Sequence, residues 1–274
     1  MTASGVAADR KSWTTFYASL RRENPVGTAV NNPRSFPTIE FGNLDANLRF
    51  LDDTGLLRRG HKVLEIGCGR GTLVHRLTMQ GLDVVGVETS ETRIEESRAL
   101  YGALPIERIS GTALPFQDEQ FDLVLSFDVL EHIPDTQRHL LEVRRVLKPG
   151  GWYLLQTPNK WTNSIFETIR WRSVSKWRSD HCSLHTYRQL RRRLSALGFD
   201  AALADVKVVT PFFREKVRRY LGRAGLALLA VANPDRLPLR ARTNFYVRAH
   251  KLAATQAPVS ARESVVGSNR PIES

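Results

Sequence analysis

The sequence predicts an α/β fold in which a mainly parallel sheet carries helices on both faces. The apolar run of residues 63–66 passes through a glycine-rich turn into residues 73–77, whose apolar side chains have helical spacing. Two further apolar runs, residues 83–88 and 121–127, are each followed by a segment with helical periodicity. Buried strands that alternate with amphipathic helices are typical of doubly wound α/β domains.

Length and composition fit this fold class. The 274 residues, 42% of them hydrophobic and 25% charged, suffice for one α/β domain with additional elements. Two cysteines are too few for a disulfide framework and indicate a reducing, cytoplasmic compartment. Residues 1–11 are small and polar, so no secretory signal is expected. The longest apolar stretch, residues 221–232, is too short to cross a bilayer, which takes roughly 20 residues.

The chain begins with elements that precede the first strand. Residues 1–12 are predicted to be disordered, and residues 13–22 place aromatic and leucine side chains on one side of a short helix. Three prolines between residues 24 and 37 break any regular element and indicate a covering loop. Helical spacing returns over residues 41–57, and this helix leads into the first strand.

The turn after the first strand has glycine at positions 67, 69 and 71. Glycine adopts positive φ angles and lacks the Cβ atom that would hold a ligand away from the backbone. The free N–H groups at the start of the following helix add donors for a polar ligand. A strand-to-helix turn with incidental glycines is the alternative. The dinucleotide-binding fingerprint would place its third small residue at position 72, where the chain has Thr72.

An acidic residue closes the second predicted strand. Glu88 lies 17 residues beyond Gly71, and a carboxylate at this strand end can accept hydrogen bonds from both hydroxyls of a ribose. The alternatives are a solvated loop acid or a cap for the helix that starts near Ser90, whose hydroxyl is a good N-cap. Because the glycine turn lies upstream, ribose binding is the favoured interpretation.

Further elements follow in regular order. The segment after the fourth strand is predicted to be a helix that runs through Val143 and Leu147 and stops at Lys148-Pro149-Gly150-Gly151. Residues 253–274 are rich in Ser and Pro and predict a disordered tail. The other predicted elements are a helix over 90–101, strands over 106–110, 121–127 and 152–156, a helix over 187–197 and a final strand over 243–250.

Several motifs along this series make a family resemblance specific. They are Glu65-x-Gly67-x-Gly69-x-Gly71, Leu114-Pro115-Phe116, Phe121-Asp122-Leu123-Val124, Val129-Leu130-Glu131-His132 and Leu147-Lys148-Pro149-Gly150-Gly151. In this order and spacing they resemble the class I S-adenosylmethionine-dependent methyltransferases, in the subfamily that includes the ubiquinone-biosynthesis O-methyltransferases. The resemblance covers residues 60–160 well and extends weakly to residue 200.

This resemblance implies a Rossmann-like seven-stranded sheet with its last strand antiparallel. It also implies S-adenosyl-L-methionine as the cofactor, held at the carboxyl ends of the first four strands. Many relatives place an aspartate where Thr112 stands, so the implied adenine contact departs from the family pattern there. The implied cofactor-binding residues are Glu65, Gly67, Cys68, Gly69, Gly71, Glu88, Thr89, Thr112, Ala113 and Phe127.

The predicted organisation of the chain has four parts. Residues 1–40 hold the N-terminal helix and the covering loop, and residues 41–160 form the cofactor-binding core. Residues 161–252 form an acceptor-side insert and complete the sheet. Residues 253–274 are the tail.

Two histidines are candidate catalytic residues. Methyl transfer from a sulfonium is an in-line displacement, so the protein mainly supplies alignment and local electrostatics. A hydroxyl acceptor has to lose its proton, and histidine is the natural base. His132 follows the fourth strand, with helix capping as its alternative role. His181 precedes the helix over 187–197 and is a candidate base or orienting residue on the acceptor side.

No metal site is expected. Imidazole, thiolate and carboxylate are all metal ligands, and four such side chains occur within six residues. No second cluster supports metal binding, so this arrangement is not assigned to a metal. The four residues are Asp180, His181, Cys182 and His185.

The net charge of +12 predicts attraction to an anionic partner. Residues 160–193 carry nine Lys and Arg against two acids, and residues 211–223 repeat a basic and aromatic pattern. A cover over the active site, with tryptophans inward and arginines in water, is the first interpretation. An anionic membrane surface comes next, and single-stranded RNA is less favoured because recognisable RNA modules are absent. The tryptophans concerned are Trp161, Trp171 and Trp177.

The predicted activity is methyl transfer to a hydroxyl of a small or lipid-linked acceptor, such as a quinone precursor or a glycolipid sugar. N-methylation of an amino sugar or another amine, a basic RNA-binding methyltransferase and a cofactor-binding regulator without turnover are the alternatives. The expected location is the cytoplasm, with peripheral attachment to the inner membrane face as a further option.

Overall fold

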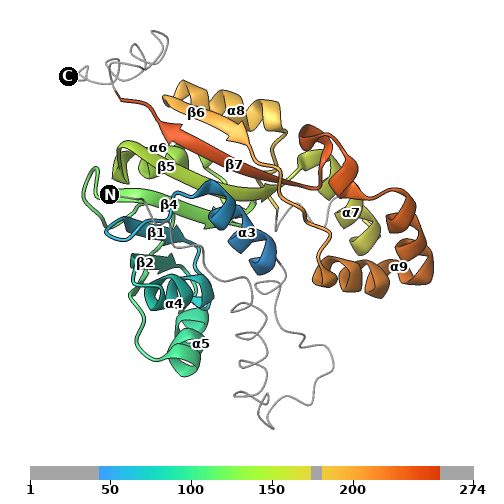
Figure 1. The fold of residues 1–274 in the computed structure, drawn as a ribbon, viewed down its shortest axis with the longest axis horizontal. Helices are drawn as coiled ribbons and strands as arrows, with labels where there is room; N and C mark the ends of the chain where they lie inside the picture. Colours follow the sequence, from blue (N-terminus) through green and yellow to red (C-terminus); the bar gives the residue numbers. More distant parts are fainter. Residues whose placement is uncertain (1–42, 174–180, 254–274) are drawn as a thin grey trace, which may run out of the picture. The chain divides into compact units, whose positions relative to one another are not determined.

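A computed structural model describes residues 43–173 and 181–253, which form a seven-stranded sheet with flanking helices (Figure 1). The strands are β1 (Lys62–Ile66), β2 (Asp83–Glu88), β3 (Ile106–Arg108), β4 (Phe121–Phe127), β5 (Leu147–Pro158), β6 (Phe199–Leu203) and β7 (Asn244–Lys251). The helices are α3 (Leu44–Thr54), α4 (Thr72–Met79), α5 (Glu91–Tyr101), α6 (Thr136–Val146), α7 (Lys160–Trp171), α8 (Tyr187–Ala196) and α9 (Pro211–Val231). Short 3-10 turns cover Leu130–His132, Pro234–Arg236 and Leu239–Ala241.

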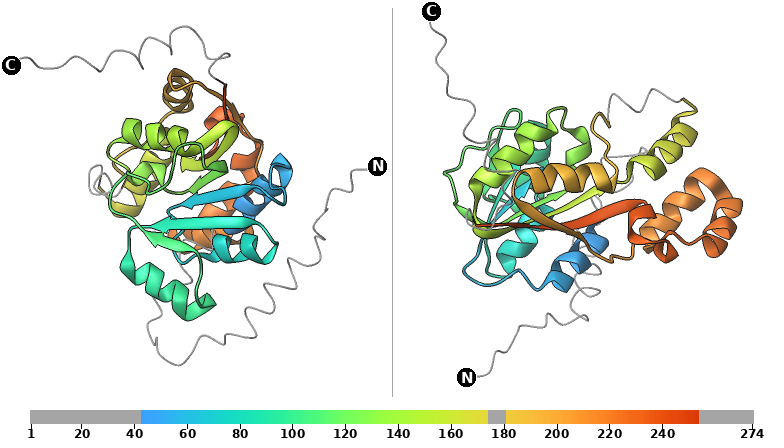
Figure 2. Two further views of the ribbon diagram at one scale, coloured as in Figure 1. Left: turned by 90° about the vertical axis from the view of Figure 1, so that its left-hand side faces the viewer. Right: turned by 90° about the horizontal axis from the view of Figure 1, so that it is seen from above.

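The sheet order is β3-β2-β1-β4-β5-β7-β6. Strands β1 to β5 pair in parallel, whereas β7 is antiparallel to both β5 and β6. Helices α3 and α4 lie on one face of the sheet, and α6 and α8 lie on the other (Figure 2). The predicted fold class, including the antiparallel last strand, is therefore confirmed.

Local signals explain where several elements begin and end. Helix α5 starts as predicted, because the Ser90 hydroxyl oxygen accepts a hydrogen bond from the backbone N–H of Arg93. Helix α3 ends earlier than residue 57, at Gly55, whose φ of +62° gives a left-handed cap. The predicted N-terminal helix, covering loop and tail lie outside the described residues, except for residue 253.

Strand β5 differs from its prediction. Helix α6 does end at Val146, but the segment predicted as its stop signal is the first part of β5, which was expected to begin at residue 152. The register between β4 and β5 shifts in this region. The ammonium group of Lys148 lies 2.9 Å from a carboxylate oxygen of Asp122 on β4, and this ion pair holds the irregular segment to the sheet.

Three polar side chains, linked by hydrogen bonds, lie in the apolar core between α6 and the sheet. The hydroxyl of Tyr153 lies 2.7 Å from Oγ of Ser126 and 3.4 Å from Nε2 of His139, and all three residues are buried. Burial disfavours the imidazolium form and lowers the pKa of His139 to about 4. The imidazole is therefore neutral in the folded protein near neutral pH.

We expect the protein to lose stability between pH 6.5 and pH 4 because of His139. An unfolded histidine has a pKa of about 6.5, so the unfolded chain binds more protons than the folded one across this interval. The stabilisation is complete above about pH 6.5 and falls by about 3 kcal/mol toward pH 4. Urea unfolding at pH 7 and pH 4.5 measures the loss. A His139→Leu variant should lose less over the same interval, and an equal loss would contradict the assignment.

Candidate functional site

The candidate site lies where the parallel strands end. Strands β1 to β4 run in the same direction, so the segments that follow them meet at one edge of the sheet. This edge brings together the glycine turn after β1, Glu88 at the end of β2 and the segment that follows β4. The predicted cofactor residues come from these segments and from the loop after β3.

The glycine turn is a backbone cradle that excludes side chains. Gly67, Gly69 and Gly71 have φ angles of +68°, +56° and +73°. A Cβ atom on Gly67 would lie 2.5 Å from a methyl carbon of Val129. The turn therefore packs directly against the segment after β4, and glycine is required both by the backbone angle and by this contact.

Gly71 offers a test in which backbone strain and packing can be separated. A Cβ on Gly71 would lie within 3.0 Å of atoms in Ser97, Leu104 and Ile106, whereas one on Gly81, at a similar φ, would meet nothing within 4 Å. We expect Gly81→Ala to destabilise by about 1 kcal/mol, from strain alone. Gly71→Ala adds overpacking, for a total of about 2–4 kcal/mol. Urea unfolding measures both, and equal losses would contradict the packing argument.

Glu88 is tied into both neighbouring turns. Its side chain is 5% exposed, and one carboxylate oxygen accepts a hydrogen bond of 2.8 Å from the N–H of Gly69. The other oxygen accepts from the backbone N–H groups of Thr89 and Ser90, at 2.8 and 2.9 Å. These two N–H groups precede α5, whose N-cap is Ser90, so Glu88 braces the turn before the helix and does not cap the helix itself. The same carboxylate also reaches the glycine turn.

Other predicted cofactor residues occupy distinct positions. Glu65 is buried on β1, between Gly86 and Leu125 of the neighbouring strands. The Cys68 side chain is also buried, since a Cβ on Gly86 would lie 2.7 Å from its sulfur. The Cys68 N–H donates to the Val87 carbonyl and the Cys68 carbonyl accepts from the Gly71 N–H, so this residue holds the shape of the turn. The half-buried ring of Phe127 packs at the end of β4.

The loop after β3, which holds Thr112 and Ala113, is anchored by α6. The Leu114 N–H donates to the Glu142 carboxylate at 3.0 Å. The Arg145 guanidinium donates to the Leu114 carbonyl at 2.9 Å and also bonds to Glu142. This hydrogen bond to Arg145 is the main reason why the pKa of Glu142 is lowered. Sequence reasoning did not identify this anchor, because its partners lie about thirty residues apart.

Asp128 is a second feature that sequence reasoning missed. It follows β4 with a φ of +54°, which is rare for a residue other than glycine. Its carboxylate accepts a hydrogen bond of 2.6 Å from the Asn43 side chain, and its N–H donates to the Gln156 amide oxygen at 2.9 Å. The amide nitrogen of Gln156 is fully buried and has no hydrogen-bond partner. A carboxylate just after a buried strand is the signal that could have drawn attention to this position.

The two candidate histidines lie together. The ring centroids of His132 and His181 are 5.1 Å apart, although 49 residues separate them in the sequence. Their side chains come from the 3-10 turn after β4 and from the segment before α8. The side-chain amide nitrogen of Asn163, on α7, lies 2.9 Å from Nδ1 of His181. Asn163 was not predicted as a site residue.

The segment around His181 borders a polar hollow of about 360 Å³. Its lining comes from residues 134–135, the first two residues of α6, segment 182–185 and two side chains of α8. His185, buried here, has a lowered pKa because burial disfavours its charged form. Within residues 43–173 and 181–253, no three His, Cys, Asp or Glu side chains are placed to hold a metal ion.

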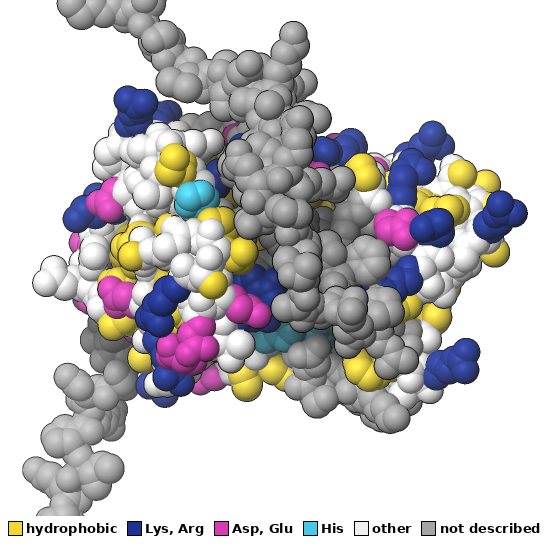
Figure 3. Space-filling model, turned by 90° about the horizontal axis from the view of Figure 1, so that it is seen from below, with side chains coloured by type: hydrophobic (Ala, Val, Ile, Leu, Met, Phe, Trp, Pro, Cys, Tyr) yellow, Lys and Arg dark blue, Asp and Glu magenta, His cyan; other side chains and the backbone are white. Residues whose placement is uncertain are grey.

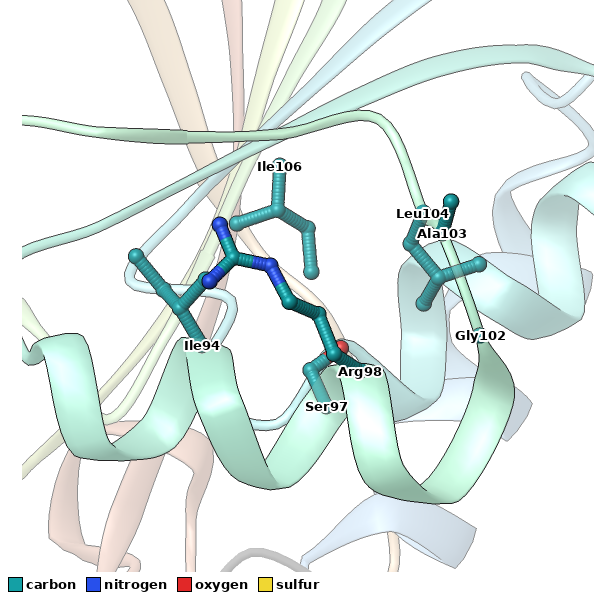
Figure 4. A pocket seen from close by; sticks show the side chains of 7 residues that line it. All are labelled: Ile94, Ser97, Arg98, Gly102, Ala103, Leu104 and Ile106. Atoms are coloured by element: carbon teal, nitrogen blue, oxygen red, sulfur yellow. The ribbon is translucent and has the colours of Figure 1, made fainter.

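A second cavity, of about 320 Å³, lies between α5 and the segment that enters β3 (Figure 4). Ile94, Ser97 and Arg98 line it from the helix, and Leu104 and Ile106 line it from the other side. Ser97, Leu104 and Ile106 also lie next to Gly71, so the cavity borders the glycine turn, but none of the predicted site residues lines it. We therefore do not assign it to the candidate site.

Helix α7 does not have the orientation expected of a cover with inward tryptophans. Trp161 and Trp171 are both exposed, so that interpretation is wrong for these two residues. Trp177 lies outside the described residues. None of the helices in the described part of the chain is long and apolar enough to cross a membrane.

Comparisons with known proteins match a large part of this chain. A family model described as a methyltransferase domain matches residues 40–203. A ubiquinone biosynthesis O-methyltransferase from Roseobacter denitrificans is 35% identical over 124 residues, or 43% of this chain and 50% of the relative. The chain spans about half the length of the curated relatives it matches.

Solved structures show the same fold at low identity. An S-adenosylmethionine-dependent methyltransferase from Mesorhizobium loti is 18% identical, with a TM-score of 0.53 over 76% of this chain and 97% of that chain. Phosphoethanolamine N-methyltransferase 2 from Haemonchus contortus, in complex with S-adenosyl-L-methionine, is 22% identical. Its TM-score is also 0.53, over 76% of this chain and 52% of that chain.

Proposed function

The chain belongs to the methyltransferase domain family, and we propose that it transfers a methyl group from S-adenosyl-L-methionine to a hydroxyl of a small or lipid-linked acceptor. The observation that carries the proposal is the hydrogen bond between the Gly69 N–H and the buried Glu88 carboxylate. It joins the glycine turn to an acid at the carboxyl ends of the strands, where open α/β sheets bind their ligands.

The residues present fit this cofactor. The three glycines of the turn have positive φ angles and no side chains, so a ligand can approach the backbone closely. When bound, S-adenosyl-L-methionine supplies a methyl group on a positively charged sulfur. In the proposed arrangement, Glu65 and the glycine turn hold the methionine end and Glu88 binds the ribose. The anchored loop with Thr112 and Ala113 flanks the adenine, and Phe127 packs near the cofactor.

The histidine pair supports a hydroxyl acceptor. A hydroxyl is a weak nucleophile until a base removes its proton, whereas a neutral amine is nucleophilic without that help. With the Asn163 amide nitrogen facing Nδ1, that atom accepts a hydrogen bond and Nε2 of His181 carries the ring proton. We therefore assign His181 to hold the acceptor oxygen through Nε2–H. His132 beside it is assigned to take the proton.

The class of the methyl acceptor is inferred from the histidine pair and from the name of one relative. The curated relative from Roseobacter denitrificans is named as an O-methyltransferase of ubiquinone biosynthesis, which supports a hydroxylated aromatic compound. The polar hollow beside His181 could accept the polar part of such a molecule. A glycolipid sugar presents similar hydroxyl chemistry and belongs to the same proposal.

Transfer of a labelled methyl group tests the proposal directly. Purified protein is incubated with methyl-labelled S-adenosyl-L-methionine and either a dihydroxylated quinone precursor, a glycolipid extract, an amino sugar or total RNA. Label in a hydroxyl compound is the expected result. Label only in the amine or in RNA would overturn the hydroxyl assignment. Calorimetric cofactor binding without transfer to any acceptor would favour a regulator without turnover.

A further inference from the structure

Helix α7 carries an apolar stripe on its exposed side. Trp161, Ile165 and Ile169 are 67%, 64% and 57% exposed. Their spacing of four residues places them along one side of the helix. In an ordinary surface helix such a stripe faces the core.

The polar side of α7 faces the protein instead. Glu167 is only 4% exposed, and its carboxylate accepts a hydrogen bond of 3.0 Å from the indole N–H of Trp171. Asn163, on the same helix, reaches His181. Helix α7 thus turns polar side chains toward the protein and its apolar stripe toward water. The stripe would be more stable against an apolar partner than in water.

Helix α9 supplies positive charge beside α7. The ammonium group of Lys216 lies 4.9 Å from the centroid of the Phe166 ring, and the Phe166 and Tyr220 rings are 6.2 Å apart. Helix α9 has five Lys and Arg residues against one acid, Glu215, which pairs with Arg218. Its second half, after the kink at Gly222, exposes aliphatic side chains as well. These are Leu228 and Val231.

The two helices lie at the same end of the described fold (Figures 1 and 2). In a space-filling view from below, the right-hand end shows lysine and arginine side chains interspersed with hydrophobic ones and an acidic one (Figure 3). We call this surface the α7/α9 face and define it by its exposed apolar and cationic residues. They are Trp161, Ile165, Ile169, Trp171, Arg219, Arg223, Leu228 and Val231.

We propose that the α7/α9 face binds the surface of an anionic lipid membrane. Tryptophan is favoured at the membrane interface, and isoleucine and leucine gain from leaving water for the acyl boundary. Arginine beside them is attracted by acidic headgroups. RNA fits less well, because the stripe is largely aliphatic and offers few ring faces on which bases could stack.

Helix α7 connects this face with the histidine pair. Ile165 and Asn163 are two positions apart on one helix, and Asn163 holds His181 from the protein side. Docking of α7 on a membrane would therefore set the histidines at a fixed distance from the lipid surface. This consequence rests on the proposed function, whereas membrane binding itself does not.

Vesicle co-sedimentation without cofactor or acceptor tests the proposal. We expect retention on vesicles of phosphatidylglycerol and phosphatidylcholine, weak retention on phosphatidylcholine alone, and release by salt. Each cationic residue near an anionic surface contributes a factor of about five in partitioning. Arg219→Glu combined with Arg223→Glu should therefore reduce binding at least about tenfold. The matched control reverses Arg191 and Arg192, which are exposed on α8.

The apolar stripe has its own variant and control. Trp161→Ser with Ile165→Ser should also reduce retention at least about tenfold, while Met79→Ser, an exposed apolar residue on α4, should not. Cofactor binding is measured by calorimetry for each variant. A variant that binds the cofactor normally is folded, so its loss of vesicle binding is separate from any loss of the proposed function. Equal retention on neutral and anionic vesicles would overturn the proposal. The proposal would also be overturned if single-stranded RNA displaced the protein from vesicles and the Trp161→Ser, Ile165→Ser variant bound this RNA as well as the native protein does.

Discussion

Replacing Glu88 with alanine is expected to weaken S-adenosyl-L-methionine binding at least about one hundredfold. The variant has no carboxylate to accept hydrogen bonds from the ribose hydroxyls. Each hydrogen bond to a charged group contributes about 1.5–3 kcal/mol to binding. The change also removes the acceptor for the Gly69, Thr89 and Ser90 N–H groups, so the glycine cradle loses its brace. Isothermal titration measures the dissociation constant.

Two further variants make the Glu88 result interpretable. Glu107→Ala removes an exposed acid from the neighbouring strand β3 and should leave cofactor affinity unchanged. Glu88→Gln keeps one oxygen acceptor and the side-chain volume, so its affinity should fall between those of the native protein and Glu88→Ala. Cofactor binding by Glu88→Ala at native affinity, in a folded protein, would remove the assignment of Glu88 to the ribose.

Replacing His132 with alanine is expected to lower kcat about one hundredfold, at the lower end of what a general base contributes. The acceptor hydroxyl would then have no side chain to take its proton. Because His132 is exposed, added imidazole should restore part of the rate. Rescue of this kind would not follow from a merely structural role. His250→Ala, a half-buried histidine on β7, is the control.

The assignment of His181 predicts a different kinetic pattern. Loss of the Nε2–H donor in His181→Ala should raise KM as well as lower kcat, because the acceptor oxygen is no longer held. Asn163→Asp should have a similar effect, since a carboxylate accepts from Nδ1–H and leaves Nε2 without its proton. If both variants left KM and kcat unchanged, the histidine pair would have no part in acceptor binding.

Much of the fold was predictable because its signals are local. Apolar runs identified β1, β2 and β4, and Ser90 identified the start of α5. Strand β6, Phe-Asp-Ala-Ala-Leu, was not singled out. It is short and contains two alanines, so its pattern is weak, and its place in the sheet depends on pairing with β7.

The parts of the site formed by residues close together in the sequence could be predicted. The parts formed by contacts between distant residues could not. Glycine spacing and the acid at position 88 could be recognised from the sequence alone. The partners of Asp128 and Leu114 come from other elements, 85 and 28 residues away. The direction of the α7 tryptophans likewise depends on how the helix packs. Composition alone could not decide between an inward and an outward indole.

The position of β7 has a consequence for how the chain reaches its native state. This strand fills the space between β5 and β6, and it ends at Lys251. A nascent chain therefore cannot close its sheet until nearly all of its described length has left the ribosome. Until then the free edge of β5 can pair with foreign strands. Deleting residues 244–251 should thus yield an aggregating product rather than a smaller enzyme.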